Sequence, residues 1–495
     1  MRNHKILCLI FLFSSLLFAQ NIPKTGLLFD DAAYDKTPMK ARNVAFQDVL
    51  SEQSSTSLKD FVPAIKNQGG YGTCVGWSTA YYGRTILNAR IENLTNIEDV
   101  SKSAFSPVFT YLNANTEDDY NCQGGAFIGK AMTTMVDVGS LYFEDYNVMC
   151  DTAIPEALVE RAKENKIKDF TRLFGDEEVN EVKIESVKRS LVNGNPVVIG
   201  FMVENSFYTA ENVFEPDNAG TTGGHAMCVI GYDDEKYGGS FEIVNSWGPN
   251  WGNNGFIWVR YMDFATYSKY AFEMIPQKKT KKKEMVEDAE EVEAVEVVEK
   301  SVLEGALDLK LYDGSIMEVS NQPGVFQNSV LGWQDVVVDK ASQSIGDYST
   351  KEMYPAQTKY RMYAKVNKPA YVYVIGMDSN GDGGVLFPHE EGISPYINYE
   401  GTSVVIPGAS SWFRMSGDVT SDYSIVIFSE EKINAQEVKN KIDEMEGALL
   451  DKLYIIFKDD LINKEAVTLS EDSVGFRAEY DKGTMAMMIL DIKRN

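Results

Sequence analysis

The chain has 495 residues, of which 44% are hydrophobic and 24% charged, and its formal net charge is −26 at pH 7. The composition is that of a globular protein, and the length predicts roughly two or three domains. So acidic a chain argues against a nucleic-acid partner, because it would repel the phosphates.

The first twenty residues have the pattern of a secretory signal peptide. A short basic leader, MRNHK, precedes ILCLIFLFSSLLFA, an apolar run that is too short and too terminal for a typical spanning helix. We expect cleavage near Ala19, so that residues 1–19 are a signal peptide; an uncleaved anchor is the alternative. No later run is long and apolar enough to span a bilayer, so we expect an exported mature protein without an integral membrane segment.

Cleavage of this leader would leave four cysteines, which the sequence separates into different roles. Export permits disulfides, and Cys122 and Cys150 lie in a loop-rich region where they are candidates for a pair. Cys228 lies in the apolar strand pattern HAMCVIGY, where a free thiol behaves as a small hydrophobic group. Neither of these roles accounts for Cys74, so its function has to be explained separately.

The residues around Cys74 have the pattern of an α+β domain, with helices first and strands afterwards. We predict helices over residues 74–91, 155–167 and 180–193. The apolar runs NPVVIGFMV, HAMCVIGYDD, SFEIVNSW and GFIWVRYM then predict strands.

Changes in composition divide the chain further. A charged stretch that runs from a lysine cluster into a glutamate–valine run is typical of a solvated linker, although the lysines alone also fit a surface-binding patch. The strand-rich remainder, with AYVYVIGM, GGVLFP, SVVIP, YSIVIFS and MAMMILDI and one predicted helix over 433–457, indicates a mainly β domain. After the leader we therefore predict a short polar N-terminal segment (20–56), the α+β domain (57–276), a charged linker (277–300) and a β-rich accessory domain (301–495).

Cys74 follows a glycine-rich turn at the head of a predicted helix, a placement that suits a nucleophile. Such a cysteine needs a base, a group that orients the base, and donors for an oxyanion. The chain has three histidines. His4 belongs to the leader and His389 to the second domain, so the candidate base is His225, which follows Gly-Gly at a strand mouth.

Three further residues complete the candidate site. The side-chain oxygen of Asn245, at a strand end, is suited to accept the imidazole N–H, and Trp247 beside it is suited to shield that bond from water. The side-chain amide of Gln68 is a candidate oxyanion donor together with the backbone N–H of Cys74. Each residue taken alone also fits a purely structural role.

The ordered set Gln68, Cys74, His225 and Asn245, within NQGGYGTC and NSWG, resembles the papain-type cysteine peptidases over roughly residues 55–275. The resemblance implies a helical left lobe that carries the cysteine and a β-rich right lobe that carries the histidine and asparagine. It implies hydrolysis of protein or peptide substrates through a Cys–His–Asn triad, starting from a thiolate–imidazolium pair, with no metal and no cofactor.

The segment CQGG (122–125) resembles the C-x-G-G segment of the same family. This resemblance implies that Gly124 and Gly125 bind substrate and that the second glycine pairs with the substrate backbone.

The chain departs from the family pattern at three points. Val75 stands where tryptophan usually follows the nucleophile. Tyr71 replaces a cysteine that usually bonds to the cysteine of C-x-G-G, which leaves Cys122 for Cys150. The segment before the peptidase domain is too short for the long helical inhibitory pro-region of many relatives, so the means of inhibition is left open.

Two other classes of protein are alternatives. One is a catalytically inactive papain-like protein that serves as a surface binding or adhesion module. The other is a transglutaminase-like acyltransferase, although that class generally uses aspartate as its third group.

The second domain resembles a β-rich accessory domain of unknown function found in exported bacterial proteins. With the leader, this leads us to expect a bacterial source and a periplasmic, cell-surface or secreted location. Asp378, Asn380, Asp382 and Gly383 have the spacing of a calcium loop, but His389 replaces the usual acidic twelfth ligand. We therefore favour a hairpin turn there.

Overall fold

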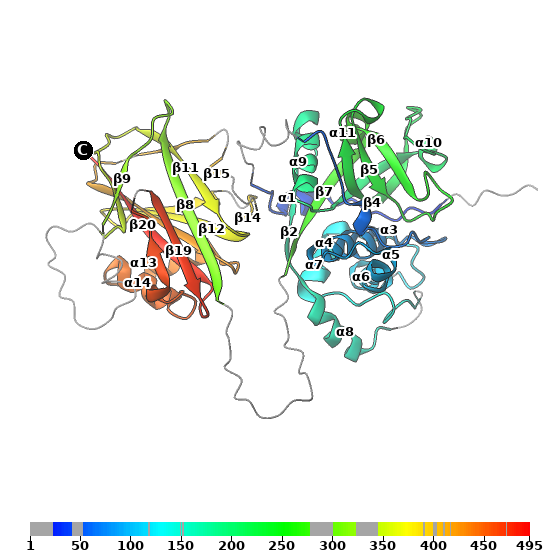
Figure 1. The fold of residues 1–495 in the computed structure, drawn as a ribbon, viewed down its shortest axis with the longest axis horizontal. Helices are drawn as coiled ribbons and strands as arrows, with labels where there is room; N and C mark the ends of the chain where they lie inside the picture. Colours follow the sequence, from blue (N-terminus) through cyan, green and yellow to red (C-terminus); the bar gives the residue numbers. More distant parts are fainter. Residues whose placement is uncertain are drawn as a thin grey trace, which may run out of the picture.

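The computed structural model shows two domains side by side, with the helices and strands of the first drawn in blue to green and those of the second in yellow-green to red (Figure 1). The structure describes residues 23–41, 53–116, 119–148, 150, 153–277, 300–322, 345–389, 392–398, 403–408, 411–415, 417–471 and 473–495. The predicted signal peptide and almost all of the predicted charged linker lie outside these ranges.

The first domain contains a seven-stranded sheet in the order β2-β7-β3-β4-β5-β6, with β1 paired to β4. All of its pairings are antiparallel. The four strands predicted from apolar runs are β3 to β6 of this sheet. The strands are β1 (Ser55–Ser57), β2 (Ile167–Arg172), β3 (Val197–Glu204), β4 (Thr221–Asp233), β5 (Ser240–Val244), β6 (Phe256–Arg260) and β7 (Ser268–Pro276).

The predicted helix over 74–91 is one continuous helical segment, made of α3 (Cys74–Gly76), the π-helical η2 (Trp77–Arg84) and α4 (Thr85–Ile91). Glycines let it pack closely. A Cβ added to Gly76 would lie 2.1 Å from the carbonyl oxygen of Pro107, and one on Gly83 would lie 2.9 Å from Val198 of β3. The segment is therefore held against both the helical lobe and the sheet.

The remaining helices surround this segment and the sheet (Figure 1). The predicted helix over 155–167 is shorter than expected because the chain passes through a 3₁₀ turn into β2, whereas the predicted helix over 180–193 is α9. The remaining helices of the first domain are α1 (Asp31–Lys36), η1 (Lys59–Phe61), α5 (Ile97–Lys102), α6 (Pro107–Ala114), α7 (Ile128–Asp137), α8 (Glu156–Ala162), η3 (Lys163–Asn165), α9 (Asn180–Val192), α10 (Asn205–Tyr208), η4 (Lys236–Gly238) and α11 (Tyr261–Tyr267).

The second domain is a sandwich of two sheets, in the orders β13-β12-β17-β20-β10-β9 and β15-β11-β8-β19-β18. In β12, Val372 and Val374 face the other sheet, whereas Tyr371 and Tyr373 face two helices. Both faces of β12 are buried, which explains its nearly continuous apolar sequence. Two short strands, β14 on β12 and β16 on β11, complete the sheets.

The elements of this domain are β8 (Ser301–Leu311), β9 (Val319–Asn321), β10 (Tyr348–Thr350), β11 (Lys359–Val366), β12 (Ala370–Asp378), β13 (Gly383–Phe387), β14 (Tyr396–Ile397), β15 (Val404–Ile406), β16 (Phe413–Arg414), β17 (Ser421–Ser429), α13 (Ala435–Glu444), α14 (Leu449–Phe457), η5 (Lys464–Ala466), β18 (Val467–Leu469), β19 (Val474–Tyr480) and β20 (Met485–Lys493).

The prediction of one helix over 433–457 was wrong, because this segment forms two helices, α13 and α14. The backbone leaves the helical conformation at Met445. Gly447 then has a φ of +112°, which glycine tolerates best. The apolar pattern continues across the break because both helices pack on the same sheet.

The segment with calcium-loop spacing is the turn between β12 and β13, where Met377 pairs with Gly383. The carboxylate of Asp378 accepts the backbone N–H of Asn380 at 2.8 Å and that of Asp382 at 3.0 Å. The acidic side chain thus stabilises the turn. Among the described residues there is no cluster of three or more His, Cys, Asp or Glu side chains suited to a metal, and no helix long and apolar enough to cross a membrane.

Candidate active site

Cys74 begins α3, directly after the glycine-rich turn, and its side chain is fully buried. The backbone amides of Ala226 and Gly26 direct hydrogen bonds at its sulfur. Ala226 follows His225 in β4, so the fold brings the strand with the candidate base to the candidate nucleophile.

His225, Asn245 and Trp247 form a compact group. His225 lies inside β4 rather than at the predicted strand mouth, because Gly223 and Gly224 already belong to the strand, and Asn245 directly follows β5. The imidazole Nε2 lies 2.7 Å from Oδ1 of Asn245, which also accepts the backbone N–H of Ser246 at 2.7 Å. The Trp247 ring stacks on the imidazole at 4.4 Å between centroids. Among the described residues the imidazole Nδ1 has no hydrogen-bond partner, so it is available to accept a proton.

Gln68 is held against the NSWG turn. Its side-chain oxygen accepts the hydroxyl of Ser246 at 2.6 Å, and its backbone N–H donates to the Ser246 carbonyl at 2.8 Å. These bonds orient the Gln68 amide so that its Nε2 can donate elsewhere. This positioning role of Ser246 was not predicted from the sequence, although its place in NSWG was a signal.

The cleft between the lobes is filled by the N-terminal stretch of residues 24–29, which we call the cleft segment. The Lys24 carbonyl accepts Nε2 of Gln68 at 2.8 Å and Nε1 of Trp247 at 3.2 Å. The Lys24 carbonyl thus accepts a hydrogen bond from the Gln68 amide, the group that was predicted to donate to an oxyanion.

Further along, the cleft segment pairs through its backbone with both walls of the cleft. On one side, Ala126 donates to the Gly26 carbonyl at 2.9 Å and accepts the N–H of Leu28 at 3.0 Å. On the other, Leu27 donates to the Gly224 carbonyl at 3.2 Å. The cleft therefore binds an extended peptide backbone.

Gly26 is the residue of the cleft segment that passes beside Cys74. A Cβ added there would lie 2.0 Å from the carbonyl oxygen of Gly72, and a Cβ on Gly125 would lie 2.5 Å from the Gly26 carbonyl oxygen. Glycine at both positions allows the two backbones to come this close. From the sequence, residues 20–56 were predicted only to be a short polar segment, so this arrangement was missed.

An apolar subsite beside the cleft holds the side chain of Phe29. Its ring packs edge-to-face on Tyr270 at 5.1 Å. A Cβ on Gly224 would lie 2.5 Å from that ring, and one on Gly200 would lie 3.3 Å from it. The two glycines thus make room for a large apolar side chain.

Burial in this closed site opposes both charges of the thiolate–imidazolium pair that the resemblance implies. Burial raises the pKa of the Cys74 thiol to about 12 and lowers that of the His225 imidazole to about 4. Hydrogen bonds from backbone amides to the sulfur, and from the imidazole to Asn245, oppose these shifts but are weaker. With the cleft filled, the exclusion of water thus opposes the charged form of each group.

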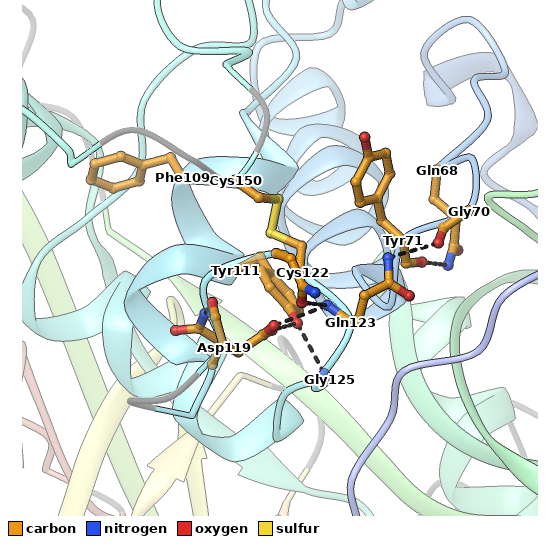
Figure 2. The surroundings of a disulfide bond; sticks show 12 residues. Gln68, Gly70, Tyr71, Phe109, Tyr111, Asp119, Cys122, Gln123, Gly125 and Cys150 are labelled. Carbon is orange, nitrogen blue, oxygen red and sulfur yellow. Dashed lines mark hydrogen bonds between the residues drawn. A yellow bond between two sulfur atoms is a disulfide. The ribbon is translucent and has the colours of Figure 1, made fainter.

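The CQGG loop is fixed by a disulfide between Cys122 and Cys150, whose Cα atoms are 5.7 Å apart (Figure 2). The backbone N–H of Gly125 donates to the Tyr111 hydroxyl at 2.9 Å, and that hydroxyl donates to the Asp119 carboxylate.

Of the two glycines predicted to bind substrate, Gly125 borders Gly26 of the cleft segment and Gly124 borders Asp119. The backbone bonds to the cleft segment come from the next residue, Ala126.

The comparisons with known proteins agree with this architecture. Residues 52–275 match the model of the papain family of cysteine proteases, and residues 353–432 match a domain of unknown function, DUF4384. A peptidase C1-like protein of Acanthamoeba polyphaga mimivirus is 26% identical over 39% of this chain and 63% of its own length. Cysteine proteinase EP-B 1 of Hordeum vulgare is 28% identical over 41% of this chain and 51% of its own length. The chain thus spans about half to two thirds of the length of these relatives.

Solved structures of cysteine proteases are also similar to this chain. Xylellain, a cysteine protease from Xylella fastidiosa, is 21% identical with a TM-score of 0.43, over 52% of this chain and 97% of that protein. Procathepsin L2 of Tenebrio molitor is 17% identical with a TM-score of 0.41, over 52% of this chain and 79% of that protein. Residues 52–275 of the chain are a papain-family cysteine peptidase domain, and a DUF4384 domain follows them.

Proposed function

We propose that this protein is a cysteine peptidase that hydrolyses peptide bonds through Cys74, His225 and Asn245. The observation that carries the proposal is the imidazole of His225, held at 2.7 Å by Asn245 through Nε2 and left with an available Nδ1 in the strand whose next amide reaches the Cys74 sulfur. This is the arrangement that a nucleophilic thiol and its base require.

The reaction begins when the cleft segment leaves and water enters. Loss of the desolvation penalty lowers the thiol pKa, and the N-terminal end of the helix that starts at Cys74 favours the thiolate. The thiol proton moves to Nδ1 of His225, and the sulfur attacks the carbonyl carbon of the peptide. Gln68 Nε2 and the backbone N–H of Cys74 donate to the resulting oxyanion.

The tetrahedral intermediate then collapses with release of an amine. The imidazolium of His225 gives its proton to the leaving nitrogen, and a thioester to Cys74 remains. A water molecule, deprotonated by His225, attacks the thioester carbonyl, and the thiolate leaves as the carboxylic acid product forms. Asn245 keeps the ring oriented, and Trp247 covers the bond between them.

The substrates are proteins or peptides that bind as extended chains. The cleft segment supports this proposal, because its backbone pairs with Gly224 on one wall and Ala126 on the other. While the segment stays there, the same bonds keep substrate out, so the closed form is latent.

We also propose that the protein is exported from a bacterial cell, to the periplasm, the cell surface or the medium. The basic leader and apolar run at the N-terminus support this proposal. The disulfide between Cys122 and Cys150 is consistent with an oxidising compartment.

The direct test is hydrolysis of a fluorogenic casein by the purified protein opened with Gly26→Val, a substitution whose Cβ would collide with the Gly72 carbonyl, with and without Cys74→Ala. We expect activity in the opened protein and none when Cys74→Ala is added. Cys228→Ala is the matched control, because Cys228 is also a buried free thiol but lies in the core of the first domain. Hydrolysis that is undiminished when Cys74→Ala is added would refute the assignment.

A further inference from the structure

A short strand joins the cleft segment to both domains. Residues 38–40, which we call the clamp strand, run between β2 at the edge of the first domain's sheet and residues 392–394 of the second domain. Figure 1 places α1, β2 and β14 where the two domains face each other.

The backbone of the clamp strand alternates between the domains. Toward the first domain, Lys40 donates to the Arg172 carbonyl at 2.9 Å, and Arg172 donates to the Pro38 carbonyl at 3.0 Å. Toward the second domain, Met39 donates to the Gly392 carbonyl at 2.5 Å and its carbonyl accepts from Ser394 at 2.8 Å. The clamp strand thus lies between β2 and residues 392–394, and it loses half of these bonds if the second domain moves away.

A buried carboxylate joins the same three parts of the chain. Both carboxylate oxygens of Glu273 accept from the ammonium group of Lys40, at 2.7 and 2.6 Å. The Asn398 amide of the second domain donates to the same carboxylate at 3.0 Å. Glu273 is 1% exposed and Lys40 is 8% exposed, so each depends on its partners for the solvation it has lost.

The domains also contact each other directly beside the clamp strand. Lys432 pairs with Asp169 at 2.6 Å, and Lys168 donates to the Glu430 carbonyl and lies 3.3 Å from Glu431. Ile275 of β7 is buried in the apolar cluster between α13, α14 and the second domain's sheet. The docked arrangement therefore buries both polar and apolar groups.

The connection from the clamp strand to the cleft is short and anchored. Between them lies α1, where the Tyr34 hydroxyl donates to the Phe174 carbonyl at 2.7 Å and the Tyr34 ring stacks on Tyr270 at 4.1 Å. Tyr270 also contacts Phe29 of the cleft segment. A displacement of the clamp strand is thus carried to the cleft by a few packed residues.

We propose that the accessory domain is an intramolecular inhibitor. When it is docked on the peptidase domain, its hydrogen bonds to the clamp strand hold that strand in place. The cleft segment therefore stays over Cys74. The inference rests on the proposed function, because its site of action is the same cleft. Undocking removes the bonds of Met39 to the second domain and the support of Asn398 for the Lys40–Glu273 pair. The cleft segment then leaves more often and exposes the thiol.

The test measures how fast iodoacetamide alkylates Cys74 in the full-length protein, followed by mass spectrometry of the Cys74 peptide. One variant, Lys168→Glu with Lys432→Glu, places negative charge against Glu430, Glu431 and Asp169. We expect alkylation roughly tenfold faster than in the parent, and roughly threefold faster for Lys432→Glu alone. Adding Asp169→Lys to Lys432→Glu restores opposite charges and should return the rate toward that of the parent.

A second variant acts at a separate point of the same interface. Asn398→Asp puts a second carboxylate beside Glu273 and should also accelerate alkylation. Matched controls are Lys351→Glu, in the exposed pair with Glu318, and Asn440→Asp, on the exposed side of α13; both should alkylate at the parental rate.

Parental alkylation rates in both interface variants would overturn the inference, as would equal acceleration in the controls. Alkylation does not require hydrolysis. If the variants are labelled faster yet cleave no casein, inhibition by the accessory domain is supported and the proposed peptidase activity is refuted. If casein is cleaved but labelling is unchanged, the proposed peptidase activity is supported and inhibition by the accessory domain is refuted.

Discussion

Nε2 of Gln68 donates a 2.8 Å hydrogen bond to the backbone carbonyl of Lys24, at the head of the candidate active site. A carbonyl of the chain itself thus occupies the donor that would stabilise an oxyanion. The same segment excludes water from Cys74 and His225 and changes which protonation states they favour.

Gly26→Val should open the cleft. Its side chain would collide with the Gly72 carbonyl, since even a Cβ would lie 2.0 Å from that oxygen. We expect iodoacetamide to alkylate Cys74 at least about tenfold faster, because the clash costs more than about 1.4 kcal/mol. The matched control is Gly384→Val in β13, where an added Cβ meets nothing within 4 Å. Unchanged alkylation in Gly26→Val would show that the segment does not protect the thiol.

Gln68→Ala should lower kcat of the opened enzyme, such as the Gly26→Val variant, about a hundredfold, because an oxyanion donor is lost. KM should change much less, since the donor acts mainly in the transition state. Gln436→Ala, on the exposed face of α13, is the control and should leave both constants unchanged. A rise in KM without a fall in kcat would argue that Gln68 only binds substrate.

Ser246→Ala tests a positioning residue. The Ser246 hydroxyl donates to Oε1 of Gln68 at 2.6 Å in a buried setting, and its loss leaves the Gln68 amide held through Nε2 alone, by the Lys24 and Tyr71 carbonyls. We expect kcat to fall about tenfold, in line with the loss of one buried hydrogen bond. In a Gln68→Ala background the same substitution should have little further effect, and additive losses would contradict the coupling.

The buried thiol of Cys74 and imidazole of His225 should make the stability of the fold depend on pH in two ranges. The folded pKa of His225 is lowered from 6.5 to about 4, so the unfolded chain binds the proton more tightly and stability falls as pH drops through that range. The folded pKa of Cys74 is raised from 9.0 to about 12, so the unfolded chain ionises first and stability falls as pH rises through that range.

Thermal melts across pH, with His225→Gln and Cys74→Ala as comparisons, measure these windows. Each variant should reduce the pH dependence of stability in its own range and leave the other range unchanged; part of the alkaline dependence remains, because burial also raises the pKa of the Cys228 thiol. A parental slope in both variants would assign the pH dependence to other groups.

Lys40→Ala should destabilise the protein by about 3–5 kcal/mol, because it leaves the carboxylate of Glu273 buried and without its cation. Urea unfolding measures the change. Lys351→Ala breaks an exposed pair with Glu318 and should cost about 1 kcal/mol or less. Similar losses in the two variants would contradict the importance of burial at Glu273.

Much of the architecture could be predicted because its signals are local. The helix that starts at Cys74 and strands β3 to β6 have apolar patterns of the right period. Asn245 and Trp247 are neighbours in the sequence, and both contact the His225 ring in the structure. The helix predicted over 433–457 was wrong because two helices on one sheet share a periodic pattern, and the backbone turn at Gly447 interrupts it.

The cleft segment and the clamp strand could not be predicted in this way. Their bonds to Ala126, Gly224 and Gly392 run through backbone atoms, which every residue carries, and join positions far apart in the chain. Such bonds impose few demands on side chains, so residues 23–41 read as weakly patterned. Gly26 was the one local sign of a close backbone approach.

The sequence by itself determined which groups are available for chemistry, because the type, order and local spacing of Gln68, Cys74, His225 and Asn245 suffice to propose a thiol nucleophile, its base and its donor. Only the tertiary structure decided that the cleft is filled and that burial there opposes the charged forms of the thiol and the imidazole. The physical reason is that desolvation depends on what lies against a group in space, and here that is a segment about fifty residues upstream of the nucleophile, tied to a second domain.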